Sequence, residues 1–126
     1  MNGYITDAIG FRAFGTNDDI TCLSLPNTIK VIETEACCAK SKLRDVKINR
    51  NSELEIIGES AFCNCDKLNY FFIPKNVRHL GPKAFYYCSE LSKVEIGENS
   101  NLQEIGDQCF ASTALKSFAL PSSVKK

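Results

Sequence analysis

The stretch IGESAFCNCDKL, at residues 57–68, decides the fold because the chain repeats it. The next copy reads LGPKAFYYCSEL, at residues 80–91. An alanine–phenylalanine pair, or its equivalent, recurs at intervals of 23, 25, 23 and 25 residues. The five pairs are Ala13-Phe14, Ala36-Cys37, Ala61-Phe62, Ala84-Phe85 and Cys109-Phe110. Self-similarity at such a regular period is the sequence signature of a solenoid of stacked repeats.

A triplet of apolar residues with the spacing i, i+3, i+5 follows each pair. The triplets are Ile20-Leu23-Leu25, Leu43-Val46-Ile48, Leu68-Phe71-Ile73, Leu91-Val94-Ile96 and Leu115-Phe118-Leu120. The last two members alternate with polar neighbours, which is the period of a strand with one buried face. A strand this short cannot bury its apolar face alone, so the pattern predicts that the copies stack as a parallel ladder.

The repeat boundaries follow from the apolar residues that close each unit, at Ile32, Ile57, Leu80 and Ile105. They divide one domain, residues 1–126, into repeats of about 9–31, 32–56, 57–79, 80–104 and 105–126. Two of the repeats carry two extra residues, in segments 50–52 and 98–100, which we interpret as a wider turn. We expect the alanine–phenylalanine segment to form a short helix or 3₁₀ turn on the wall opposite the strand.

These residues resemble the BspA-type leucine-rich repeat, whose pattern runs approximately I-G-x-x-A-F-x-x-C-x-x-L-x-x-I-x-I-P-x-x-V-x-x-I. The resemblance extends from about Ile9 to Val124 and recurs five times in register. It implies an α/β leucine-rich-repeat solenoid with one parallel β-strand per repeat and helical or 3₁₀ turns on the convex side. It also implies a protein-interaction module of adhesion or scaffold type, and it supplies no catalytic residues. The chain departs from this pattern at four positions, which are Asn17, Cys37, Lys40 and Thr113.

Composition limits the classes of partner. The chain holds 15 basic and 15 acidic residues, a balance that argues against nucleic acid or an anionic membrane as partner. No apolar run approaches the roughly 18 residues of a membrane span, and residues 1–7 do not begin a signal peptide. Taken alone, the chain is expected to be soluble and cytoplasmic. The family resemblance, or a longer parent protein, would place it at the cell surface.

The outward strand residues are the candidate partner-binding site. By alternation, we expect a concave sheet with two exposed rows: Cys22, Asp45, Tyr70, Lys93, Ser117 and Ser24, Lys47, Phe72, Glu95, Ala119. Tyr70 and Phe72 supply an apolar centre, and Asp45, Lys47, Lys93 and Glu95 supply a charged rim. This is the usual anatomy of a protein recognition hot spot. The alternative interpretation is that the two aromatic residues only stabilise the sheet.

Seven cysteines, an odd number, favour reduced thiols over a complete disulfide framework. Cys63, Cys65, Cys88 and His79 do not follow a standard structural zinc spacing, so no metal or other cofactor is expected. Cys65 and Cys88 share a repeat slot and are expected in the core, although stacking also permits a disulfide between them. In the pair Cys37-Cys38 we expect one buried and one outward thiol.

The sequence gives little support for an enzyme. His79 is the single histidine and falls in a connecting turn, and no nucleophile-elbow, paired-carboxylate or phosphate-loop pattern appears. Glu33 and Glu35 are close together but belong to a repeat connection. The alternative to a binding module is a structural subunit or spacer that assembles through its end strands, such as residues 117–120.

Overall fold

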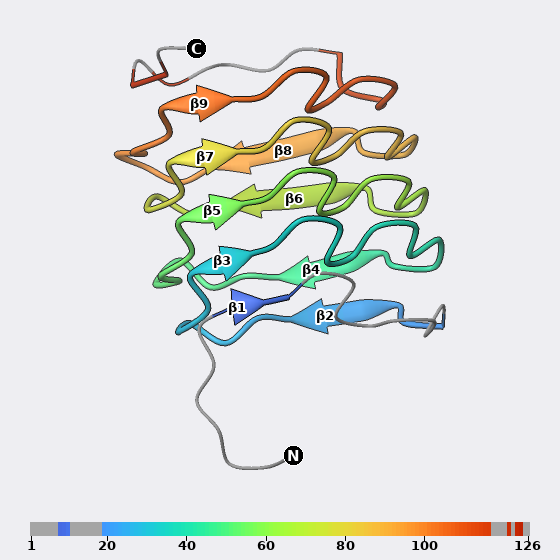
Figure 1. The fold of residues 1–126 in the computed structure, drawn as a ribbon, viewed down its shortest axis with the longest axis horizontal. Coiled ribbons are helices and arrows are strands. Elements are labelled where there is room, and N and C mark those ends of the chain that lie inside the picture. The colour runs from blue at the N-terminus through green and yellow to red at the C-terminus, as the bar shows by residue number, and fades with distance from the viewer. Residues whose placement is uncertain (1–7, 11–18, 117–120, 122, 125–126) are drawn as a thin grey trace.

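The computed structural model describes residues 8–10, 19–116, 121 and 123–124. The chain winds into a stack of coils in which each of the first four repeats contributes two short strands, one on each of two facing walls (Figure 1). The strands of the two walls run in opposite directions, and every pairing between strands is parallel. The molecule is therefore a parallel-strand β-solenoid.

The first wall is a five-stranded sheet with the order β1-β3-β5-β7-β9. Its strands are β1 (Ala8–Ile9), β3 (Val31–Ile32), β5 (Ile56–Ile57), β7 (His79–Leu80) and β9 (Glu104–Ile105). The second wall carries the apolar triplets, and we call it the triplet wall. Its strands are β2 (Cys22–Ser24), β4 (Asp45–Lys47), β6 (Tyr70–Ile73) and β8 (Lys93–Ile96), paired as β2–β4 and β6–β8.

The expectation of one strand per repeat was wrong, because the residues that close each repeat form the five-stranded sheet. The inward position of this sheet holds Ile32, Ile57, Leu80 and Ile105, and the first three of these are at most 1% exposed. The other residue of each two-residue strand points outward. Stacking the closing residues at strand distance lets them pair their backbone groups just as the triplets do.

The expected helical turns are also not what the described residues form, since none of them is helical. In the alanine–phenylalanine segment, Ala36 N donates to Glu33 O within its repeat (3.1 Å), but Cys37 N donates to Ala61 O of the next repeat (2.8 Å). Two residues in each described copy of this segment adopt positive φ, such as Ser60 (55°) and Asn64 (59°). Every second amide of this segment donates to a carbonyl of the next repeat. These amides cannot also make the i to i−4 hydrogen bonds of a helix.

The core is a column of aromatic rings between the walls. Phe85 stacks on Phe62 at 5.5 Å between ring centroids and on Phe110 at 5.3 Å. Phe71 of the triplet wall contacts both Phe62 (5.3 Å) and Phe85 (4.8 Å) at tilted angles. Leu68, Phe71 and Ile73 have no exposed area, which confirms that the triplets point inward.

The cysteine slot of the repeat holds buried thiols that donate to the preceding repeat. Cys65 Sγ donates to Cys37 O (3.1 Å) and Cys88 Sγ donates to Phe62 O (3.0 Å). Burial raises the pKa of the Cys65 thiol to about 12, and burial likewise raises the pKa of Cys88. Both thiols are free, so the structure does not contain the disulfide that stacking permitted between them.

A disulfide joins Cys38 to Cys63 instead, with 4.8 Å between their Cα atoms. The other five cysteines are free, so the thiols do not form a complete disulfide framework. Cys37 is buried in the phenylalanine slot, whereas Cys38 is half-buried and meets Cys63 of the next repeat. The bridge covalently joins the second and third repeats.

The glycine after each closing residue marks a close approach between repeats. A Cβ atom on Gly58 would lie 2.9 Å from Ile32 O, and one on Gly81 would lie 2.5 Å from Glu59 N. A Cβ on Gly106 would meet Pro82 N more closely still. No side chain fits at these three positions without moving backbone.

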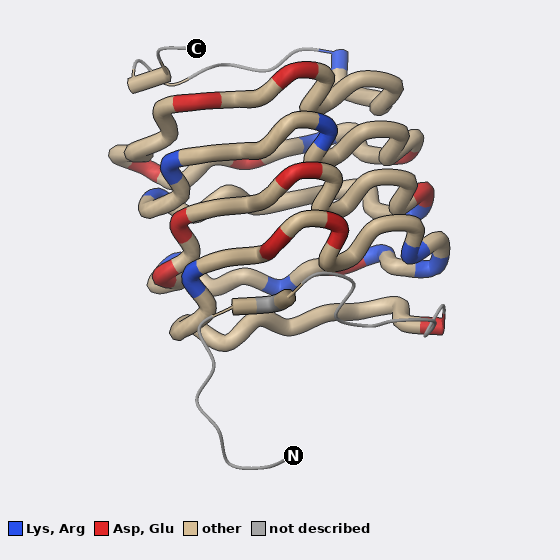
Figure 2. Tube along the Cα trace, viewed as in Figure 1, with Lys and Arg blue, Asp and Glu red and all other residues tan. Residues whose placement is uncertain are grey.

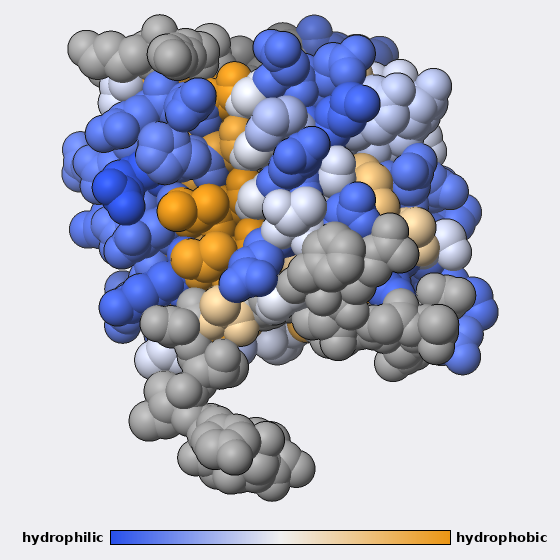
Figure 3. All heavy atoms as spheres, in the orientation of Figure 1, coloured by the Kyte–Doolittle hydropathy of each residue, from blue (hydrophilic) through white to orange (hydrophobic). Residues whose placement is uncertain are grey.

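The two outer faces differ in chemistry. Figure 3 shows the outward face of the five-stranded sheet, where apolar side chains gather over β3 and β5. The outward residues there are Val31 and Ile56, both half-buried, and the same row continues as His79 and Glu104. Lys, Arg, Asp and Glu are interspersed along the coils rather than separated (Figure 2).

No helix among the described residues has the length and apolarity to cross a membrane.

Some predictions fall outside the described residues. They are the first pair, Ala13-Phe14, the cysteine slot at Asn17, the outward residues Ser117 and Ala119, and the candidate assembly strand at residues 117–120.

Candidate functional site

The six predicted partner-binding residues all lie on the outward side of the triplet wall. Asp45 and Lys47 come from β4, Tyr70 and Phe72 from β6, and Lys93 and Glu95 from β8. Five of them are exposed and Phe72 is half-buried, while the residues between them, Val46, Phe71 and Val94, turn inward. The alternation expected from the sequence places them there.

The outward rows align laterally within each strand pair. Cys22 lies beside Asp45 and Ser24 beside Lys47, and in the other pair Tyr70 lies beside Lys93 and Phe72 beside Glu95. The ladder is interrupted between β4 and β6, which belong to separate two-stranded sheets. This interruption coincides with the longer interval, 25 residues from Asp45 to Tyr70 against 23 from Cys22 to Asp45.

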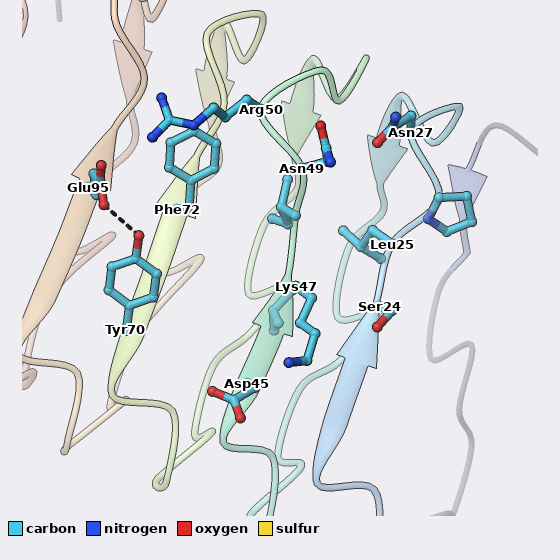
Figure 4. Close-up of a pocket in the computed structure, with 13 residues that line it drawn as sticks. Ser24, Leu25, Asn27, Asp45, Lys47, Asn49, Arg50, Tyr70, Phe72 and Glu95 are labelled. Atoms are coloured by element: carbon cyan, nitrogen blue, oxygen red, sulfur yellow. Dashed lines mark hydrogen bonds between the residues drawn. The ribbon is translucent and has the colours of Figure 1, made fainter.

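A groove of about 750 Å³ lies over this interruption. Figure 4 shows its lining: β6 carries the large side chains of Tyr70 and Phe72, and β2 presents the small side chain of Ser24. The remaining lining residues are Leu25, Pro26, Asn27, Asp45, Val46, Lys47, Ile48, Asn49, Arg50 and Glu95. The groove thus has an aromatic wall on one side, a low wall on the other and a partly apolar floor. It brings together five of the six predicted residues, and Lys93 does not line it.

Tyr70 and Glu95 are held together at the edge of the groove. The Tyr70 hydroxyl donates to Glu95 Oε1 at 2.6 Å (Figure 4). This hydrogen bond to the carboxylate, with partial burial, raises the pKa of Tyr70 to about 12. The nearby Arg50 acts in the opposite direction. The bond fixes the orientation of the Tyr70 ring, so that its apolar body faces the groove while its polar end is satisfied.

The Phe72 side chain is held in place by the next repeat. Its ring lies over Gly97 of the next repeat, where a Cβ atom would come within 3.5 Å of Phe72 Cζ. Phe72 and Arg50 also line a second, smaller hollow of about 230 Å³ together with Lys75. Phe72 therefore stands as a partition between the groove and this hollow. Because both aromatic rings are positioned within the free protein, Tyr70 and Phe72 would lose little side-chain entropy on binding a partner.

The sequence interpretation missed Arg50, Asn27 and Asn49. Arg50 belongs to the segment interpreted only as a wider turn, and the structure shows how that turn is built. Asn51 N donates to the Asn49 side chain (2.8 Å), and Leu54 N donates to the hydroxyl of buried Ser52 (3.1 Å). The two extra residues were a usable signal, because an insertion directly after an outward strand carries its side chains toward the outward face.

The other sequence candidates do not form a second site. His79 Nδ1 lies 3.2 Å from Glu104 Oε1 on the five-stranded sheet, away from the groove. Cys63 is disulfide-bonded, while Cys65 and Cys88 donate to backbone carbonyls. Within the described ranges, no three histidine, cysteine, aspartate or glutamate side chains come together as metal ligands.

Comparison with protein families matches residues 7–126 to the BspA type leucine rich repeat region, in six copies. The chain belongs to the BspA-type leucine-rich repeat family. The stacked coils, the buried triplets and the column of phenylalanines are thus the structural expression of the BspA-type repeat in this chain. No curated protein sequence matches it significantly.

Solved structures share this BspA-type fold. The chain is similar to the pneumococcal vaccine antigen PcpA, with a TM-score of 0.78 and 26% identity over 94% of this chain and 29% of that one. A leucine-rich repeat protein from Bacteroides ovatus gives a TM-score of 0.62 at 18% identity, covering 96% and 48% of the two chains. A leucine rich cell surface protein from Faecalibacterium prausnitzii gives 0.56 at 19%, covering 95% and 46%. The chain spans less than half the length of these proteins.

Proposed function

We propose that the chain is a protein-interaction module, of adhesion or scaffold type and without catalytic activity, that binds its partner through the groove of the triplet wall. The observation that carries this proposal is the placement of two oriented aromatic side chains, Tyr70 and Phe72, beside a partly apolar floor. Charged side chains surround them. Interfaces derive most of their binding energy from such central aromatic anchors enclosed by a polar rim.

The size of the groove supports this proposal. A hollow of about 750 Å³ falls within the range of sites that enclose a ligand or a few side chains of a partner. Lys93 takes no part in its lining and is proposed as part of the outer rim. Balanced charge suits a specific protein contact better than a purely electrostatic one.

We favour a cell-surface setting over a cytoplasmic one. The Cys38–Cys63 disulfide supports this choice, because disulfides persist in oxidising compartments and are rare in the cytosol. One of the similar structures is described as a leucine rich cell surface protein, and another as a vaccine antigen.

Affinity capture tests the proposal. Wild-type protein and the double variant Tyr70→Ala/Phe72→Ala are immobilised at equal density and exposed to the same mixture of extracellular proteins. We expect the double variant to lose a retained partner, with a cost of a few kcal/mol in affinity. Circular dichroism establishes that both proteins are folded.

The matched control is Tyr87→Ala, which removes a tyrosine that is 47% exposed and does not line the groove. It should retain the same partner as the wild type. Equal retention by wild type and double variant would contradict the proposal.

A further inference from the structure

The groove has a distribution of charge that restricts what it can accept. Arg50 lies at the end of the groove beyond Phe72, and Asp45 lies at the opposite end, with Lys47 between them (Figure 4). Lys75 stands on the other side of Phe72, in the smaller hollow that shares Arg50. Two cationic side chains, Arg50 and Lys75, therefore lie beside Phe72, whereas the Lys47 ammonium points toward Asp45 (Figure 4).

These cations are not neutralised within the described part of the chain. Several other basic residues have ion-pair partners, for example Lys42 with Asp19 at 3.0 Å and Arg78 with Glu55 at 3.1 Å. Lys47, Arg50 and Lys75 have no such partner among the described residues. Of the nearby anionic side chains, Glu95 already accepts the Tyr70 hydroxyl, and Glu98 lines the smaller hollow without an ion pair to Arg50 or Lys75.

We infer that the groove binds an extended protein segment in which a carboxylate side chain pairs with Arg50 beside an apolar side chain packed on Tyr70 and Phe72. This inference rests on the proposed function and specifies its ligand. The groove lies along β4, from Asp45 to Arg50, so the segment lies parallel to the strand axis. In an extended chain, residues i and i+2 share one face, so a carboxylate and an apolar side chain can both point into the groove.

Arginine is well suited to this recognition. Its planar guanidinium can donate two parallel hydrogen bonds to one carboxylate. The Phe72 ring beside it, itself half-buried against Gly97, lowers the local exposure to water and strengthens that charge pair.

The same charges argue against a highly anionic partner such as a sulfated polysaccharide. Asp45 lines the groove at one end and Glu95 at its edge, and both would repel a continuous array of anionic groups. A segment with one carboxylate at the Arg50 end stays away from Asp45, and the Glu95 carboxylate near that end is engaged by the Tyr70 hydroxyl. A protein segment is thus the occupant that the charges favour.

The test uses a phage-displayed library of short random peptides selected on the wild-type protein. We expect the selected peptides to share an aspartate or glutamate close to an aromatic or large aliphatic residue. Replacing that acidic residue by its amide in the synthetic peptide should weaken binding roughly ten- to a hundredfold, as should Arg50→Ala in the protein. Arg44→Ala is the matched control, because Arg44 is an exposed arginine of the same repeat that does not line the groove.

The outcomes separate this inference from the proposed function. Peptides that bind through Tyr70 and Phe72 with no preference for an acidic residue would overturn the inference and leave the proposed function standing. A partner captured through the two aromatics, with no peptide selected, would do the same. Tight binding of heparin that Arg50→Ala abolishes would replace the protein segment by a polysaccharide. Peptides indifferent to Tyr70, Phe72 and Arg50 alike would overturn both.

Discussion

The substitution Gly81→Ala tests whether the repeat glycine is required for close approach between coils. Its Cβ would lie 2.5 Å from Glu59 N and 2.7 Å from Gly58 C, whereas ordinary contact begins at 3.4 Å. The neighbouring backbone must therefore retreat by about 0.9 Å, the difference between 2.5 and 3.4 Å. The bond from Gly81 N to Ile57 O, at 2.7 Å, spans the same junction and would be stretched beyond hydrogen-bonding length.

The expected magnitude follows from two opposing effects. Overpacking of this kind costs about 1–3 kcal/mol. Replacing glycine also restricts the unfolded chain, which returns about 0.4–1 kcal/mol. We expect a net loss of about 1.3 kcal/mol in the free energy of unfolding, the difference between the midpoints of these two ranges. At a urea dependence of about 2 kcal/mol per M, which is usual for small domains, the midpoint should fall by about 0.6 M.

The assay is urea unfolding followed by circular dichroism, with Gly10→Ala as the matched control. Gly10 follows the closing position of the first unit, yet its Cβ would have Glu33 Oε1, at 3.8 Å, as its nearest contact among the described residues. This variant should unfold at the wild-type midpoint or slightly above it. Equal destabilisation of both variants, or none in Gly81→Ala, would refute the close-approach argument.

Three further predictions concern the core, the disulfide and the groove. Phe85→Ala should lower the free energy of unfolding by about 4 kcal/mol, and Phe85→Leu by about half of that, in denaturant titrations. Cys38→Ser/Cys63→Ser should lose about 3 kcal/mol of stability, and a wild-type protein unfolded under reducing conditions should match it. Glu95→Gln should return the pKa of Tyr70 from about 12 toward 10 in a spectrophotometric titration of tyrosinate. In the wild type, stabilisation by this phenol should be complete below pH 10 and lost as the pH rises through 12.

The repeat and its inward residues were predictable because apolar period and spacing report burial directly. Leu68, Phe71 and Ile73 are buried for the reason their spacing indicated, and the outward rows follow by alternation. The second sheet was missed because two residues per repeat, such as Ile56-Ile57, are too short to show a strand period. Their pairing depends on the neighbouring repeats, which a local pattern does not describe.

The groove was only half predictable for a related reason. The aromatic wall follows from strand alternation at Tyr70 and Phe72. Its opposite wall and Arg50 depend on how the wider turn leaves β4, and that geometry is fixed by the side-chain bonds of Asn49 and Ser52. The Cys38–Cys63 bridge was overlooked although both cysteines directly follow the phenylalanine slot, 25 residues apart, because only the cysteines two residues further along were considered as a stacked pair.

The bridge between the second and third repeats has a consequence for a chain under tension. A pull applied to both ends would unwind the coils in sequence, but the segment between Cys38 and Cys63 is bypassed by a covalent link, so its 25-residue separation adds nothing to the extended length. At about 3.4 Å per residue, roughly 85 Å of extension is withheld until the link is reduced. The β4 side of the groove, from Asp45 to Arg50, lies within this bypassed segment, so a tethered partner that holds it would pull on the part of the molecule least able to lengthen.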